Sequence, residues 1–211
     1  MRIVIGLVLI CIGISCLAQD PEFTDYRKKT ENFSRVVDKD IRSDLASFTI
    51  GGIEESLGKS PLKKLPVKKF GENYITFDSN DIQVTIKAGV FNPSKHKLAI
   101  ENKYIVKIDN KPYLGNYGKV PTSTIEGLTI TIGPDTVPIP PAAIYNLFNP
   151  NFTFRDASGI IRSQDAVYLS KDRRKIYIYM LNKDDSGSYE VTWIVQDKKY
   201  LRRVADFGFS K

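Results

Sequence analysis

Few side chains in this sequence combine the type and the setting that acid–base chemistry needs. Glu190 lies in the middle of a predicted strand beside aromatic residues, where burial would raise the pKa of its carboxyl. A glycoside hydrolase needs a second carboxyl, which can come from any part of a sequence, so a hydrolase with paired carboxylates stays open. The structural alternative is that Glu190 faces solvent or pairs with an arginine.

Other catalytic and cofactor signatures are absent from the sequence. His96 is the single histidine and lies in a polar loop, which excludes a zinc site built on several histidines. The sequence has no G-x-S-x-G motif, no Walker A loop and no dinucleotide-binding fingerprint. Two oxygen-rich stretches, at residues 78–81 and 184–187, are interpreted as turns and not as calcium sites. We therefore expect no metal and no cofactor, and assign no catalytic residue.

The C-terminal region offers a different chemistry, the stacking of a ligand on aromatic rings. A two-residue turn at Asp197-Lys198, with Leu181 paired to Tyr189, places aromatic side chains on one sheet face and aliphatic ones on the other. The aromatic face resembles a platform for a sugar or another ligand. The candidate ligand-binding residues are Tyr177, Tyr179, Trp193, Tyr200 and Arg202. The alternative is a second buried layer of a sandwich, and a slip of one residue would move Tyr177 and Tyr179 away from Trp193.

Positive charge is concentrated between Gly58 and Phe70, where the sequence reads GKSPLKKLPVKKF. The prolines and lysines argue against a continuous helix or strand and predict an exposed connector. The functional alternative is a basic docking strip, carried by Lys63, Lys64, Lys68 and Lys69. The whole chain has a net charge of +7, which suits acidic surfaces, glycans or lipid headgroups as partners. The plainer interpretation of this charge is a solvated surface rich in lysine.

The N-terminus has the pattern of an export signal. Arg2 is followed by an apolar run over residues 3–14, and small residues at Cys16 and Ala18 predict cleavage before Gln19. The run is shorter than the roughly 20 residues that a membrane-spanning helix needs. We therefore expect no transmembrane span once the signal is removed.

The two cysteines, Cys11 and Cys16, both lie in this signal, so the mature chain is expected to contain no disulfide. A small residue before Cys16 leaves lipid attachment at that cysteine open as an alternative. We expect a periplasmic or extracellular protein, and export argues against nucleic acid as its partner.

The hydrophobic pattern divides the chain into a signal peptide at residues 1–18, a helical segment at 19–57, the connector at 58–69 and a β domain at 70–211. The last fifty residues predict a four-strand meander over Val167–Ser170, Lys175–Leu181, Tyr189–Gln196 and Lys199–Val204. After Pro140-Pro141, the stretch up to Phe148 predicts a short helix. The expected fold is mainly β, an antiparallel sandwich or open barrel with a C-terminal meander, after a short helical N-terminal segment.

Three stretches of the β domain carry a resemblance: IDNKPYLGNYGKVPTSTI, VPIPPAAIYNLFNP and IYIYMLNKDDSGSYEVTWIVQDKKY. They look like segments of exported proteins of Bacteroidota-type bacteria with no assigned activity, and the similarity runs from about Ile82 to Phe209. The resemblance implies a bacterial source and an envelope location, and it transfers no site residue. We expect an exported, non-catalytic β domain that binds a glycan, an envelope polymer or a protein partner. The alternatives are a secreted hydrolase with paired carboxylates and a purely structural accessory protein of the envelope.

Overall fold

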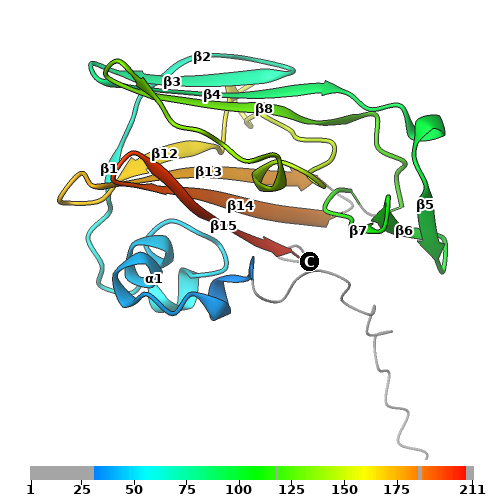
Figure 1. Cartoon of the computed structure of the whole chain (residues 1–211), viewed down its shortest axis with the longest axis horizontal. Coiled ribbons are helices and arrows are strands. Elements are labelled where there is room, and N and C mark those ends of the chain that lie inside the picture. Colours follow the sequence, from blue (N-terminus) through cyan, green and yellow to red (C-terminus); the bar gives the residue numbers. More distant parts are fainter. Residues whose placement is uncertain (1–30, 117, 185–186, 208–211) are drawn as a thin grey trace, which may run out of the picture.

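A computed structural model of the chain describes residues 31–116, 118–184 and 187–207. The protein is mainly β, as the sequence predicts. Two five-stranded antiparallel sheets lie one above the other, and a short helical segment lies beneath the lower sheet (Figure 1). The described strands do not close into a barrel. The predicted signal peptide, with Cys11 and Cys16, lies outside the described residues and stays a prediction.

The first sheet has the order β2-β3-β4-β8-β9. Its strands are β2 (Val67–Gly71), β3 (Tyr74–Ser79), β4 (Ile82–Val90), β8 (Ser123–Ile132) and β9 (Asp135–Thr136). Alternate residues of β4 show why this sheet forms: Ile82, Val84 and Ile86 are buried, whereas Gln83 between them and Lys87 after them are exposed. This alternation is typical of a strand with one face in a core and the other in water.

The second sheet has the order β1-β12-β13-β14-β15. Its strands are β1 (Lys63–Lys64), β12 (Ala166–Leu169), β13 (Lys175–Asp184), β14 (Gly187–Gln196) and β15 (Lys199–Phe207). The last four strands are the predicted meander. The turn between β14 and β15 is the predicted pair Asp197-Lys198, whose φ angles of 49° and 62° are those of a tight two-residue hairpin turn.

The main core fills the space between the two sheets. It includes Phe77 and Ile86 from the first sheet, Ile178 and Trp193 from the second, and Phe152 from a connecting loop. Trp193 has no exposed surface. Burial of so many large apolar side chains from both sheets is the main force that holds the two layers together.

The N-terminal segment covers the other face of the second sheet, below it in Figure 1. It contains the 3-10 turn η2 (Phe33–Arg35), the helix α1 (Lys39–Ala46) and the 3-10 turn η3 (Ile53–Glu55). Asp38 caps α1, because its carboxylate accepts hydrogen bonds from the backbone N–H groups of Asp40 and Ile41. A second core forms between this segment and the sheet, and its buried members are Phe33, Val36, Ile41, Leu45, Ala46, Leu62, Tyr177, Ile194 and Val204.

Smaller elements complete the chain. A three-stranded sheet contains β5 (Leu98–Glu101), β6 (Tyr104–Ile108) and β7 (Lys111–Pro112), and is preceded by η4 (Pro93–Lys95). β10 (Phe154–Arg155) pairs with β11 (Ile161–Arg162). The predicted helix before Phe148 is reduced to one 3-10 turn, η5 (Pro141–Ala143). Asn146 has a φ of 59°, a left-handed conformation that ends a right-handed helix.

The predicted connector, residues 58–69, contains two short segments of edge strand. Lys63 and Lys64 form β1, which pairs with β12, and residues 67–71 form β2, which pairs with β3. Each is the edge strand of its sheet. The prolines are tolerated because Pro61 and Pro66 lie outside the paired residues, and edge positions leave one side of the backbone unpaired in any case.

Candidate functional site

The predicted aromatic face depended on the register of β13 against β14, and that register is wrong by one residue. Leu181 pairs with Glu190 and not with Tyr189, and Ile178 faces Trp193. The two strands continue to the pair Asp184 and Gly187, so the connection is shorter than the predicted loop over residues 182–188. Because side chains alternate between faces, a shift of one residue moves Tyr177 and Tyr179 to the face opposite Trp193.

A second shift occurs between β14 and β15. Val195 pairs with Tyr200 as predicted, but the register then changes between Ile194 and Val195. Leu201 is the extra residue of this β-bulge, since Ile194 pairs with Arg202. Trp193 consequently faces Arg203 and not Arg202. The bulge therefore turns the side chain of Arg203, which the sequence analysis did not select, into the interior.

Three of the candidate aromatic residues, Tyr177, Tyr179 and Trp193, are buried and hydrogen-bonded to specific partners. Tyr177 is covered by the N-terminal segment and donates a hydrogen bond to Oδ2 of Asp44 at 2.6 Å. Tyr179 donates to Oε2 of Glu190 at 2.8 Å. Burial, the largest cause, and the neighbouring carboxylates raise the pKa of both phenols far above the usual value. Tyr177 belongs to the second core and Trp193 to the main core, and Tyr179 is buried beside Phe48, so these three residues form no exposed platform.

Glu190 anchors the N-terminal segment. Its carboxylate accepts hydrogen bonds from the backbone N–H groups of Ile50 at 2.9 Å and Gly51 at 2.7 Å, besides the Tyr179 hydroxyl. Burial raises the pKa of this carboxyl, and the hydrogen bonds oppose that change. Its cross-strand neighbour Asp206 accepts from the backbone N–H of Phe33 at 2.8 Å. The two acids are thus engaged by the covering segment, an arrangement that suits anchoring.

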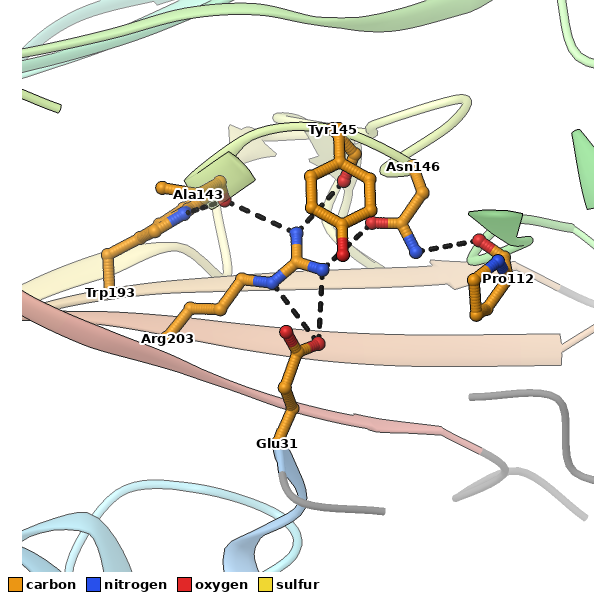
Figure 2. Close-up of polar contacts among 7 residues, drawn as sticks. All are labelled: Glu31, Pro112, Ala143, Tyr145, Asn146, Trp193 and Arg203. Atoms are coloured by element: carbon orange, nitrogen blue, oxygen red, sulfur yellow. Dashed lines mark hydrogen bonds and ion pairs between the residues drawn. The ribbon is translucent and has the colours of Figure 1, made fainter. Parts of the chain in front are cut away.

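Arg203 is the centre of a buried junction between four parts of the chain (Figure 2). Its Nε and Nη2 donate to Oε2 of Glu31 at 3.3 and 3.0 Å. Its Nη1 donates to the carbonyls of Ala143 at 3.3 Å and Tyr145 at 2.9 Å, and Nη2 also donates to Oδ1 of Asn146 at 2.9 Å. These bonds use all five N–H donors of the guanidinium. Arg203 is therefore a fully satisfied structural cation.

Neighbouring side chains extend this junction. Nε1 of Trp193 donates to the Ala143 carbonyl at 2.7 Å, and Nδ2 of Asn146 donates to the Pro112 carbonyl at 2.6 Å (Figure 2). The guanidinium of Arg203 also lies 4.6 Å from the ring centre of Tyr145, in cation–π contact. The loop over residues 140–146 is fixed by these contacts from several sides.

A surface hollow of about 700 Å³ lies beside this junction. One wall is the bulged part of β15, a second is the loop that begins at Pro140, and the third is η2 with the residues before it. Its lining residues are Glu31, Arg35, Pro140, Ala142, Ala143, Tyr145, Tyr200, Leu201, Arg202 and Arg203. Two of the predicted ligand-binding residues, Tyr200 and Arg202, thus meet in a concave surface, although the predicted sheet face does not exist.

The lining of this hollow is mixed in chemistry. Arg35 and Leu201 are exposed, whereas Tyr145, Tyr200 and Arg202 are half-buried. Partial burial, only partly offset by Arg203 and Arg202, raises the pKa of the Tyr200 phenol to about 12. At neutral pH this hydroxyl keeps its proton and is available as a hydrogen-bond donor.

The predicted lysine strip is divided between two edge strands. Lys63 and Lys64 lie on β1, and Lys68 and Lys69 lie on β2 of the other sheet. All four are exposed. Lys68 forms an ion pair with Asp78, and Nζ of Lys69 lies 5.8 Å from the ring centre of Tyr74. Charged side chains on edge strands hinder pairing with other chains, which gives these lysines a structural purpose; their docking function stays a prediction.

His96 has the loop position that the sequence indicates. Its Nδ1 lies 2.6 Å from Oδ2 of Asp109, and its ring stacks on Phe91 with ring centres 4.4 Å apart. Within residues 31–116, 118–184 and 187–207, no group of three or more His, Cys, Asp or Glu side chains is arranged to hold a metal ion.

Comparison with protein-family models, curated proteins and solved structures finds no match to this chain. In the described part of the chain, no helix has both the length and the apolar character to cross a membrane.

Proposed function

We propose that the protein is an exported, non-catalytic binding domain that holds a glycan or an envelope polymer in the hollow beside β15. The observation that carries this proposal is the concave surface with tyrosine, arginine and apolar side chains on a rigidly held frame. Saccharide sites commonly combine aromatic surface with a few placed polar groups, and tyrosine supplies both in one side chain.

Rigidity of the frame favours binding. Arg203 and Trp193 both bond to the Ala143 carbonyl, so the loop that forms one wall is fixed before any ligand arrives. A site that is already in its binding conformation loses less conformational entropy when it binds. The single carboxylate of the lining, Glu31, is paired with Arg203, whereas a hydrolase of the paired-carboxylate type needs two acids at its site. The lining thus favours binding over hydrolysis.

The test is to fill the hollow. Ala142 is exposed on η5 and lines the hollow, so Ala142→Trp places a large ring inside it. The matched control is Ala157→Trp, at an exposed alanine in the turn between β10 and β11. Both variants and the wild type are tested as the full exported chain on an array of bacterial envelope polysaccharides, with titration calorimetry on each polymer that binds.

We expect wild type and Ala157→Trp to bind the same polymer, and Ala142→Trp to bind it at least about tenfold more weakly because its indole occupies the site. Equal binding by all three proteins would remove the hollow as the site. Binding to no saccharide by any of them would overturn the proposed function. Release of reducing sugar from a bound polymer would favour the hydrolase instead.

A further inference from the structure

Three asparagines of this sequence stand two positions before a serine or threonine, the pattern of an acceptor for an N-linked glycan in an exported chain. The three stretches are Asn32-Phe33-Ser34, Asn92-Pro93-Ser94 and Asn151-Phe152-Thr153. The motif excludes proline at its middle position, so Asn92 is not an acceptor. The structure separates the other two asparagines. This inference rests on the predicted export and does not depend on the hollow beside β15.

Asn151 has the setting of an acceptor. It lies in the loop before β10 and is exposed. Its Oδ1 accepts a hydrogen bond from the backbone N–H of Thr153 at 3.3 Å, and within the described residues its Nδ2 makes no hydrogen bond. Phe152 is 1% exposed and belongs to the main core, so it anchors the loop while Asn151 stays at the surface. The exposed amide can therefore carry a bulky, solvated glycan.

Asn32 has a different setting. It is half-buried, precedes η2 and makes no capping hydrogen bond with its side chain. It lines a narrow hollow together with Tyr145 and Arg203. The next residue, Phe33, is buried in the second core and donates its backbone N–H to Asp206. A glycan at Asn32 would have to fit between the N-terminal segment and the Arg203 junction, so the folded structure disfavours it.

We infer that Asn151 is the acceptor of an N-linked saccharide in the exported chain. In this step Nδ2 of Asn151 forms a bond to C1 of the first sugar of a polyprenyl-diphosphate-linked oligosaccharide. The bond between C1 and the diphosphate oxygen breaks, polyprenyl diphosphate leaves, and the amide nitrogen loses one proton. Nothing is oxidised or reduced, and the catalyst is an oligosaccharyltransferase.

The experiment uses the full chain secreted from a eukaryotic host whose secretory pathway modifies this motif. Peptide mapping by mass spectrometry measures the occupancy of each asparagine. Thr153→Ala keeps Asn151 but removes the hydroxyl that the motif requires. Pro93→Ala completes the motif at Asn92, which is exposed and whose Oδ1 accepts from the backbone N–H of Ser94 at 3.1 Å, so this variant offers a second acceptor of similar geometry. Thermal unfolding checks that each protein is folded.

We expect the occupancy of Asn151 to exceed that of Asn32 at least about tenfold. Thr153→Ala should lose the glycan, and Pro93→Ala should carry glycans at both Asn92 and Asn151. Enzymatic removal of the glycan should shift the melting temperature by no more than about 2 °C, because a change at an exposed position has little effect on stability.

Four outcomes would overturn the inference. The first is a Pro93→Ala chain that is modified at Asn92 but not at Asn151. The second is an occupancy of Asn32 equal to or above that of Asn151. The third is unchanged modification of Asn151 in Thr153→Ala, since attachment would then not depend on the motif. The fourth is a secreted Pro93→Ala chain that carries no glycan at any asparagine.

Discussion

Two buried ionisable groups of this protein differ in how their hydrogen bonds are satisfied. Arg203 lies at one edge of the second sheet and places all five donors on four residues. Asp165 lies just before β12, and its Oδ1 accepts from the backbone N–H of Leu181 at 3.0 Å. Its buried Oδ2 has no hydrogen-bond partner among the described residues. Arg203 therefore fixes the residues around it, whereas Asp165 leaves one buried oxygen without a partner among the described residues.

The partners of a buried ionisable group decide how far burial changes its protonation. An ion pair with Glu31 and three other acceptors replace the water that the guanidinium of Arg203 loses on burial. Asp165 has only Leu181 and the nearby Ser163 to oppose burial, with a weaker contribution from Lys64, so burial raises the pKa of its carboxyl to about 8. At neutral pH we therefore expect the folded protein to hold Asp165 mainly protonated.

The largest effect is expected from removing the satisfied group. Arg203→Ala leaves Glu31 without its partner and breaks the contacts to the loop over residues 143–146. Loss of one member of a buried ion pair costs about 3–5 kcal/mol. Urea unfolding measures this change in the free energy of unfolding.

The control for this variant is Arg173→Ala. Arg173 forms an ion pair with Asp81, and the side chains of both residues are 54% exposed. Exposed pairs of this kind contribute about 0–1 kcal/mol. Equal losses in the two variants would show that the junction around Arg203 does not hold the loop.

A smaller, pH-dependent effect is expected at Asp165. Its folded pKa of about 8 lies above the unfolded value, so the folded state binds more protons between about pH 4 and pH 8. The contribution of this group to stability is full below the unfolded pKa and is lost as the pH rises towards 8. Asp165→Asn cannot ionise, so its stability relative to wild type should rise by roughly 2–3 kcal/mol from pH 5 to pH 7.

Chemical unfolding across this pH range measures the difference. Asp156→Asn is the control, because Arg162 and Ser158 hold the pKa of Asp156 down to about 2, far below the range tested. A constant difference between Asp165→Asn and wild type from pH 5 to pH 7 would contradict a buried, protonated Asp165.

The smallest effect is expected at Glu190, a buried acid with two of its three hydrogen-bond partners, Ile50 and Gly51, in the N-terminal segment. Glu190→Gln replaces one acceptor oxygen with an amide that faces the N–H of Ile50 or Gly51. We expect a loss of about 1–3 kcal/mol, because a hydrogen bond to a charged group is broken and a donor is left opposed. Limited proteolysis should then cut within residues 31–57 faster than in wild type.

Glu190→Asp is the matched variant, since it keeps the charge and shortens the side chain. Unchanged proteolysis in both variants would show that Glu190 does not hold the segment. Loss of a hydrolytic activity in Glu190→Gln, without a change in stability, would favour the hydrolase interpretation.

The sequence predicts the fold class well and the site poorly, for one physical reason. Strands such as β4 and β13 have an alternation that is local in the chain, so it is visible without the structure. The turn at Asp197-Lys198 is equally local. The face on which a side chain lies, however, depends on whether its register position is odd or even. The bulge at Leu201 and the shorter hairpin between β13 and β14 each shift the register by one residue and so reverse the face.

The junction around Arg203 joins residues that are far apart in the chain: Glu31 is 172 positions away and Asn146 is 57 positions away. No regular spacing in the sequence shows that residues so far apart belong to one junction. A two-residue turn without a bulge places Arg202 opposite Trp193, whereas the bulge at Leu201 places Arg203 there. Tyr200 is predicted on a stacking face that does not form.

The passage between β1 and β2 ties the two sheets together through the backbone. Only Leu65 and Pro66 separate the edge strand of one sheet from the edge strand of the other, and Leu65 is buried and donates its N–H to the Val167 carbonyl. The two sheets therefore share a short covalent tether along this side. At the other edge of the second sheet, β15 is joined to the loop after Pro140 by the side-chain contacts of the Arg203 junction.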